Sequence, residues 1–204
     1  MFIAITQRLV QHDSYNELRE VLSTEWGALF GAEFDAFLPL PLCFEIPFIC
    51  YESVINGCIL SGGNNLSIFN NSQENKIRDE YERQIITRCV KLQIPLLCIC
   101  RGAQVLAQYF GSEIKPCQNH IGAHNVRDKW GNEFMVNSFH NYAITNLSAD
   151  LECLAVANDN SIEAFSHKSL PFYALVWHIE RENGLNNTAI LDKFKQEILK
   201  GVRK

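Results

Sequence analysis

The feature that most constrains the fold of this chain is an apolar run that ends in a cysteine. Arginine and glycine follow this cysteine directly. Residues 94–104 read Ile-Pro-Leu-Leu-Cys-Ile-Cys-Arg-Gly-Ala-Gln, and Cys100 stands where the apolar run ends. The pattern is typical of a buried strand that enters a sharp turn and then a helix. Such a turn holds a nucleophile on a strained bend, beside a helix N-terminus that favours thiolate over thiol. We therefore predict that Cys100 is a nucleophile with its sulfur exposed at an edge of a sheet.

Strand and helix patterns alternate around this segment. The expected strands are 2–6, 36–40, 57–60 and 95–99, and the expected helices are 15–30, 75–92 and 104–109. Shorter strands are expected at 134–138, 152–157, 162–166 and 173–177, followed by a helix at 189–201. Alternating strands and helices predict an α/β fold with three layers: a mostly parallel central sheet, helices on both faces, and a small β-rich extension. A chain of 204 residues is expected to form a single domain over 1–204.

Charge and cysteine usage narrow the range of functions. The net charge is −5 without any block of lysine or arginine, which argues against nucleic acid polymers and anionic membranes as partners. No apolar run is long enough for a membrane span, and the start of the chain lacks the basic lead of a signal peptide. The eight cysteines form no Cys-x-x-Cys pair and are expected to be buried, reduced thiols. These features predict a cytoplasmic protein that acts on a small molecule.

A base and an orienting acid are predicted near the C-terminus. Residues 173–180 read Tyr-Ala-Leu-Val-Trp-His-Ile-Glu, so an expected strand ends in His178 and Glu180. Positions i and i+2 of a strand share one face, so the carboxylate can accept from one ring nitrogen while the other faces a thiol. Alone, such a pair is more often a surface feature, but together with Cys100 it indicates a catalytic triad.

Two further segments are candidate parts of the site. In Ile-Leu-Ser-Gly-Gly, residues 59–63, Gly63 has no Cβ and can bring its backbone N–H close to an oxyanion, although a tight turn explains the glycines equally well. In residues 136–142, Val-Asn-Ser-Phe-His-Asn-Tyr, His140 ends a strand-like run. It is either a pocket wall near the nucleophile or a hydrogen-bonded structural histidine, and the sequence leaves both open.

These segments together resemble the class I glutamine amidotransferase-like family, in which a cysteine is followed by a C-terminal His-x-Glu. The phrases ICRGAQVLAQYFG, ILSGG, NSFHNYAI and LVWHIE are most similar to its stand-alone γ-glutamyl hydrolase branch, and the resemblance spans nearly the whole chain. It implies a flavodoxin-like sheet. It also implies cleavage of a γ-glutamyl amide through a γ-glutamyl thioester, which releases L-glutamate and an amine or amidate.

The resemblance also assigns roles to individual positions. It implies Cys100 as nucleophile, His178 as base and Glu180 as its partner, with Gly63 and Arg101 supplying the amides of an oxyanion hole. It implies Gln104 as a side chain that helps to hold the glutamyl head group. Ser138, His140 and Arg8 are further residues that we expect to bind substrate. Three positions depart from the family pattern: Cys98 stands where glycine is usual, Asn65 where aspartate is usual, and Ile179 where proline is usual.

The identity of the leaving group stays open at this stage. Arg8, Arg127 and Lys129 are candidate contacts for a nucleotide-bearing γ-glutamyl conjugate, because guanidinium and ammonium groups suit phosphate oxygens, but each is equally well an ordinary surface charge. The alternative function is a glutaminase subunit that delivers ammonia to a separate synthetase chain. No cofactor is expected. No metal is expected either, because the histidines show no ligand spacing. The sequence does not indicate an oligomeric state.

Overall fold

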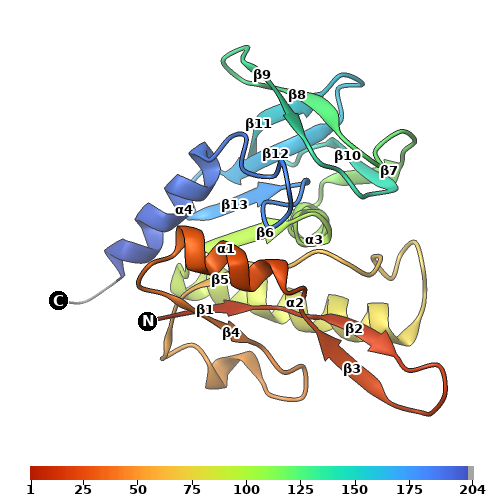
Figure 1. Cartoon of the computed structure of the whole chain (residues 1–204), viewed down its shortest axis with the longest axis vertical. Helices are drawn as coiled ribbons and strands as arrows, with labels where there is room; N and C mark the ends of the chain where they lie inside the picture. Colours follow the sequence, from red (N-terminus) through yellow and green to blue (C-terminus); the bar gives the residue numbers. More distant parts are fainter. Residues whose placement is uncertain (202–204) are drawn as a thin grey trace.

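The computed structural model describes residues 1–201 and shows one continuous sheet with helices on both sides (Figure 1). Five strands that run inward from one edge of this sheet are parallel, in the order β4–β1–β5–β6–β13. Their bounds are Leu38–Pro41 for β4, Phe2–Ile5 for β1, Ile55–Leu60 for β5, Leu96–Ile99 for β6 and Phe172–Leu175 for β13. The predicted fold class is therefore confirmed.

Antiparallel strands extend the sheet beyond β13. The order continues β12–β11–β8–β9, and β10 pairs with both β12 and β7. Their bounds are Ile162–His167 for β12, Leu151–Ala157 for β11, His124–Asp128 for β8, Glu133–Val136 for β9, Tyr142–Asn146 for β10 and Glu113–Pro116 for β7. This is the β-rich extension that the sequence predicts, although the patterns did not reveal β7, β8 or β10.

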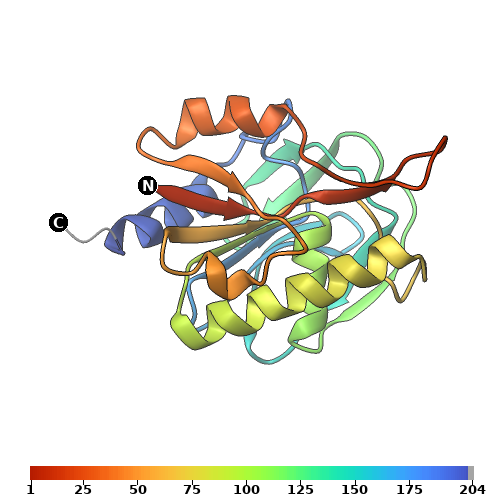
Figure 2. The same ribbon diagram turned by 90° about the horizontal axis from the view of Figure 1, so that it is seen from below.

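Helices cover the two faces of the sheet. Helices α2 (Gln73–Leu92) and α3 (Arg101–Tyr109) pack on one face. Helices α1 (Glu25–Glu33) and α4 (Ala189–Lys200) pack on the other. Figure 2 shows α1 and α2 on opposite sides of the strands. A 3-10 turn, η1, spans Phe48–Cys50. Within residues 1–201, no helix combines the length and apolar character that crossing a membrane requires.

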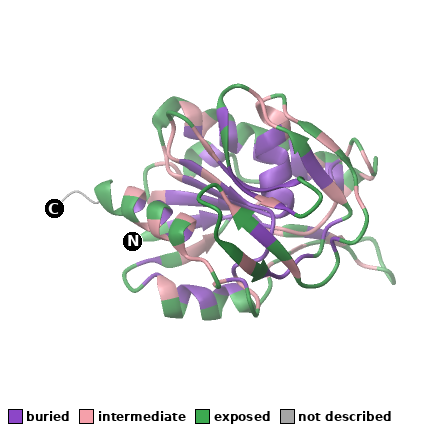
Figure 3. Cartoon of the chain, turned by 90° about the horizontal axis from the view of Figure 1, so that it is seen from above, coloured by how far each residue is buried: buried purple, intermediate pink, exposed green. Residues whose placement is uncertain are grey.

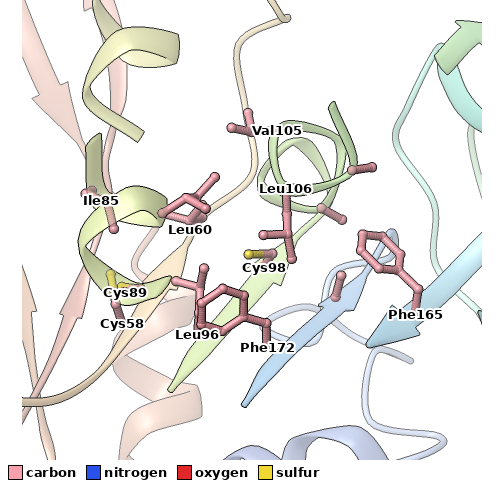
Figure 4. Packing of buried hydrophobic residues seen from close by; sticks show 14 of the residues in the cluster. Cys58, Leu60, Ile85, Cys89, Leu96, Cys98, Val105, Leu106, Phe165 and Phe172 are labelled. Carbon is pink, nitrogen blue, oxygen red and sulfur yellow. The ribbon is translucent and has the colours of Figure 1, made fainter. Parts of the chain in front are cut away.

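The core follows from strands that are apolar on both sides. In β6, Leu96 and Cys98 pack under α2 and α3, whereas Leu97 and Ile99 face the α1 and α4 side. Successive side chains of a strand point to opposite faces, so a continuous apolar run suits a strand covered twice. Figure 4 shows Cys98 beside Leu106 of α3. Figure 3 shows that the central strands are buried, whereas the outer surfaces of the helices that cover them are exposed.

The helix predicted over 15–30 is wrong in its first half. Residues Arg8–Gln11 (β2) and Leu18–Val21 (β3) form an antiparallel hairpin, and α1 begins only at Glu25. Leu18 and Val21, which supplied the helical spacing, are exposed in this hairpin. Their spacing therefore does not reflect a buried helical face. Figure 2 shows the hairpin projecting from the body of the molecule.

Candidate active site

The turn between β6 and α3 holds Cys100. Strand β6 ends at Ile99 and α3 begins at Arg101, so one residue joins them, with φ 51° and ψ −105°. Non-glycine residues rarely adopt a positive φ, and such strain is common at functional sites. A Cβ at Gly102 would collide with the carbonyl oxygen of Leu60, which shows how tightly the turn packs on β5. The predicted sharp strand-turn-helix geometry is present.

Cys100 is buried rather than exposed. The residue is only 6% exposed, and its N–H donates to the carbonyl of Leu175 at 2.8 Å, which ties the turn to β13. Gly62 packs over it: a Cβ at that glycine would lie 3.4 Å from Cys100 Cβ and 2.6 Å from His178 Cε1. The expectation of an exposed sulfur is therefore wrong, because Gly62 and the His178 ring close in on the cysteine.

His178 and Glu180 form a close pair next to Cys100. The distance from His178 Nδ1 to Glu180 Oε1 is 2.6 Å. Strand β13 already ends at Leu175, so the pair lies in the following loop and not on a strand face as predicted. Asn137 holds this loop, because its Oδ1 accepts from His178 N at 2.9 Å and its Nδ2 donates to His178 O at 2.8 Å. The sequence patterns gave no reason to select Asn137.

The surroundings of His178 favour its charged form. Burial lowers the pKa of His178, but interactions with Cys100 and Glu180 outweigh burial and raise the pKa to about 9. Because Nδ1 faces Glu180, Nε2 is left for the cysteine. An imidazolium held beside a thiol favours the thiolate, which is the nucleophilic form.

The raised pKa of His178 predicts how stability depends on pH. The pKa of His178 is near 9 in the folded state, against about 6.5 in an unfolded chain. Protonation of His178 therefore stabilises the fold fully below pH 6.5, and this contribution is lost as pH rises through 9. We expect Glu180→Gln to reduce this decline, because it removes one partner of the imidazolium. Urea unfolding of both proteins between about pH 6 and pH 10 measures the slopes. Equal slopes would contradict the assignment.

Arg78 of α2 holds the Ser61–Asn64 segment against the site. Its guanidinium donates to the carbonyl oxygens of Ser61, Gly62 and Gly63 at 2.7, 3.0 and 2.6 Å. Gly63 has φ +82°, a conformation that glycine adopts at no steric cost. With its carbonyls fixed by a buried arginine, this segment presents a preorganised backbone beside the Cys100 and His178 side chains.

A buried charge network surrounds Arg78. Glu82 accepts from Arg78 Nε at 3.0 Å and also pairs with Arg101, whose guanidinium contacts Asp79 as well. Thr6 Oγ1 donates to Glu82 Oε1 at 3.0 Å. Arg78, Asp79 and Glu82 are buried on the covered face of α2, and the sequence patterns gave no reason to select them. Helix α3 begins at Arg101, so the backbone N–H of Arg101 is one of the first four in the helix. These four N–H groups have no acceptor within the helix.

The residues predicted to bind substrate are only partly brought together. Arg8 lines the pocket beside His178, and its side chain packs against Gly63. Gln104 is buried in α3 and donates to the carbonyl of Tyr142 at 2.8 Å. Ser138 is fully buried and donates to a backbone carbonyl, that of His120.

The remaining predicted contacts lie elsewhere. His140 turns its Nε2 toward Glu163, 3.5 Å from Oε1, in a separate cluster of side chains. Lys129 pairs with Glu152 at 2.8 Å. The predicted roles of these residues at the substrate stay predictions, and the structure brings only Arg8 to the pocket mouth.

Two further side chains at this mouth were not selected from the sequence. The Phe139 ring lies 5.7 Å from the His178 ring, and the Arg181 guanidinium lies 4.6 Å from the Phe139 ring centre. Arg181 and Arg8 both line the pocket. Arg181 Nε lies 3.5 Å from Glu25 Oε2 and 4.0 Å from Glu180 Oε1, so its charge is partly neutralised, whereas Arg8 forms no ion pair within residues 1–201. Arg8 is therefore the cation better placed to attract an anionic substrate.

The departures from the family pattern leave the site intact. Cys98 is fully buried in the apolar core, where burial raises the pKa of its thiol well above the ordinary value. The carbonyl of Asn65 accepts from Arg101 Nε at 3.4 Å, and Ile179 is buried.

All eight cysteines are free. Cys50 and Cys153 are exposed, so the expectation of buried thiols fails at these two positions.

Comparison with known proteins defines the class to which this site belongs. The peptidase C26 family model matches residues 40–180, and this chain belongs to that family. A relative from Campylobacter jejuni, named γ-glutamyl-CDP-amidate hydrolase, is 53% identical over 198 residues, which cover 95% of this chain and 97% of the relative.

Solved structures share the fold at low sequence identity. A protein from Thermoplasma acidophilum, provisionally described as part of a GMP synthase, matches 98% of this chain and 94% of its own with a TM-score of 0.72 and 22% identity. A glutamine amidotransferase from Thermotoga maritima matches 98% of this chain and 84% of its own with a TM-score of 0.63 and 18% identity. Both likenesses establish the fold and nothing about substrate.

Proposed function

We propose that this chain is a cysteine-dependent hydrolase that cleaves the γ-glutamyl amide bond of γ-glutamyl-CDP-amidate. The products are L-glutamate and CDP-amidate. The observation that carries the proposal is the 53% identity to the Campylobacter jejuni enzyme of that name over nearly both whole chains. The close placement of Cys100, His178 and Glu180 supports it. We treat residues 1–204 as one catalytic domain, which the sheet running through the described residues supports; residues 202–204 lie outside them.

The proposed reaction has two halves. The Cys100 thiolate attacks the γ-carbonyl carbon, and the backbone N–H groups of Gly63 and Arg101 stabilise the oxyanion. Protonated His178 then gives its proton to the leaving nitrogen, so CDP-amidate departs and a γ-glutamyl thioester remains. Neutral His178 next takes a proton from water as the water attacks the thioester. The Cys100 thiolate then departs, glutamate is freed, and the thiolate beside protonated His178 is restored. Glu180 keeps the ring oriented through both halves.

The charge at the pocket mouth supports a phosphate-bearing leaving group. Arg8 and Arg181 line the opening, and guanidinium groups bind phosphate oxygens through charge-assisted hydrogen bonds. A neutral leaving group such as ammonia would draw nothing from these cations. The proposal also fits an enzyme that acts on a small molecule without a bound cofactor.

Kinetics with a panel of amides tests the proposal against the glutaminase alternative. Glutamate release is measured for γ-glutamyl-CDP-amidate, γ-glutamyl-GABA and glutamine with the purified chain alone. We expect kcat/KM for the nucleotide conjugate to exceed that for glutamine by orders of magnitude. Comparable values, or activity that requires an added synthetase, would favour the alternative function.

Arg8 is predicted to act on the nucleotide part of the substrate. We expect Arg8→Ala to raise KM for γ-glutamyl-CDP-amidate by up to about fivefold, which corresponds to about 1 kcal/mol for a solvent-exposed ion pair. The KM for γ-glutamyl-GABA should not change. Arg19→Ala on the same hairpin is the matched control, because Arg19 pairs with Glu17 and Tyr15 instead. Equal effects on both substrates would remove Arg8 from the leaving-group site.

A further inference from the structure

A second cluster of chemically active side chains lies apart from the Cys100 site. His120, His124 and His140 converge on Glu163, the second residue of β12, which is fully buried. The distances to Glu163 Oε1 are 3.3 Å from His120 Nδ1, 3.6 Å from His124 Nε2 and 3.5 Å from His140 Nε2. The proposed reaction uses none of these groups.

The facing atoms of this cluster lack partners. In the part of the chain that the structure describes, His120 Nδ1, His140 Nε2, both nitrogens of His124 and both oxygens of Glu163 are buried without a hydrogen bond. Buried polar groups are normally paired, so this many unpaired atoms at one point need an explanation. A hydrogen bond joins only two of these atoms, whereas a metal ion binds several ligands at once. The cluster is therefore better matched to a cation than to internal hydrogen bonds.

The spacing fits a tetrahedral metal. Zinc bonds of about 2.0–2.1 Å to nitrogen and oxygen at tetrahedral angles place neighbouring ligand atoms about 3.3–3.4 Å apart. The distances to Glu163 Oε1 are 3.3 Å from His120 Nδ1 and 3.6 Å from His124 Nε2, close to this separation, and one ligand atom from each of these three residues lies within 4.8 Å of the other two. Two imidazoles with one carboxylate form a donor set that suits zinc among the common divalent ions.

The hydrogen-bond partners on the outer ring nitrogens of two histidines also support a metal site. His120 Nε2 lies 2.9 Å from Asp159 Oδ2, and His140 Nδ1 lies 3.1 Å from the carbonyl oxygen of Tyr142. In each ring the outer nitrogen thus has an acceptor, so the inner nitrogen that faces Glu163 is the one available to a metal ion. Metal-binding histidines nearly always donate their other N–H to a carboxylate or a carbonyl in this way. A pocket of about 220 Å³ beside His120 and His124 offers an entry path.

We propose that His120, His124 and Glu163 bind one zinc ion, with a fourth position open toward the pocket beside His120 and His124. Three ligands come from the protein, a water molecule would take the fourth position, and His140, whose Nε2 lies 3.5 Å from Glu163 Oε1, helps to orient the carboxylate. The proposal departs from the expectation that no metal is involved.

The position of the site suggests what the ion stabilises. Segments 120–122 and 138–140 pair with each other, and Phe139 on the second segment faces the His178 ring. On the other side, the carbonyl of Glu163 accepts from the N–H of Val176, two residues before His178. An ion that links His120 and Glu163 would therefore fix one wall of the active site without touching the reacting atoms.

Metal analysis of the full chain tests the proposal. After purification and dialysis with zinc, we expect about one zinc ion per chain by mass spectrometry of the metal. The Cys100→Ser variant should hold the same amount, which separates this site from zinc bound at the catalytic cysteine. With Co²⁺ in place of zinc, we expect the intense visible bands of tetrahedral coordination and no sulfur-to-cobalt charge-transfer band. A wild-type chain that binds no stoichiometric zinc and gives no tetrahedral cobalt spectrum would overturn the proposal.

Matched variants locate the site. Glu163→Gln and His124→Gln should abolish stoichiometric zinc binding, and Asp159→Asn should lower zinc affinity by about 10–100-fold, as outer-partner changes do. His12→Gln, on the β2–β3 hairpin, is the control and should leave zinc content unchanged. Circular dichroism checks that each variant is folded. Zinc retained in a folded Glu163→Gln variant, or lost equally in His12→Gln, would contradict the assignment.

Discussion

Replacing Cys100 by serine is expected to lower kcat for γ-glutamyl-CDP-amidate by roughly 10⁵–10⁶-fold, the range seen when a triad loses its nucleophile. The hydroxyl keeps nearly the same shape but is a much weaker nucleophile, so the thioester cannot form. Binding should persist, because the change leaves the pocket residues Arg8 and Gly63 in place. Glutamate release and calorimetric binding of the substrate together separate lost chemistry from a lost fold.

Cys153→Ser provides the matched control for this result. Cys153 is also a free cysteine, but it lies exposed on β11, outside the candidate active site. We expect full activity in that variant. If Cys100→Ser kept more than a trace of turnover, or if Cys153→Ser lost as much, the assignment of the nucleophile would be wrong.

Removal of Glu82 is expected to cause the largest loss of stability. Burial opposes ionisation of Glu82, but Arg101 and Arg78 outweigh it, so the pKa of this carboxyl lies below its ordinary value. In Glu82→Ala, two buried guanidinium groups lose a shared counterion. Breaking one partner out of a buried ion pair typically costs about 3–5 kcal/mol. We expect a decrease of that size in the free energy of unfolding, measured by urea titration at pH 7.

The same helix supplies a control for this prediction. Glu80 is exposed, and its carboxylate accepts a hydrogen bond from Gln84 on the outer surface of α2. Glu80→Ala should therefore change the free energy of unfolding by no more than about 0.5 kcal/mol. Similar losses in both variants would show that the charge network does not stabilise the fold. A small loss in Glu82→Ala would lead to the same conclusion.

The sequence predicted the elements whose local pattern and tertiary environment agree. Residues 95–99 are apolar throughout because both faces of β6 are covered. The sharp turn at Cys100 was predicted because Arg101 and Gly102 directly follow this apolar run, and Gly102 packs closely on Leu60. The same consistency explains why α4 was predicted within a residue of its observed bounds. Where pattern and burial match, sequence reasoning is sufficient.

The failures occur where tertiary contacts override the pattern. In residues 15–24, the apolar spacing of Leu18 and Val21 mimics a helix, but backbone pairing with β2 decides the structure. On α2, the sequence patterns did not reveal that the charged Arg78 and Glu82 are buried. Each neutralises the other, and Arg78 also donates to the carbonyl of Gly63. No local signal distinguishes a buried charge pair from an exposed one.

The histidine cluster shows the same limit at longer range. His120, His124 and His140 are too irregularly spaced to suggest a metal motif, and Glu163 comes from a different strand. Only the antiparallel extension brings the four together, and the sequence patterns did not reveal β8 or β10 within it. For the candidate active site the sequence was more informative, because Cys100 and the His178–Glu180 pair each carry a local signature.

One measurement tests the central claim most directly: ³¹P NMR of γ-glutamyl-CDP-amidate incubated with the purified chain, with parallel amino-acid analysis. Attack of Cys100 on the γ-carbonyl predicts equal amounts of CDP-amidate and glutamate, without release of ammonia. In water enriched in ¹⁸O, the label should enter the γ-carboxylate of glutamate. Appearance of CDP and glutamine would show that the phosphorus–nitrogen bond is cleaved instead. That result would contradict hydrolysis through a γ-glutamyl thioester.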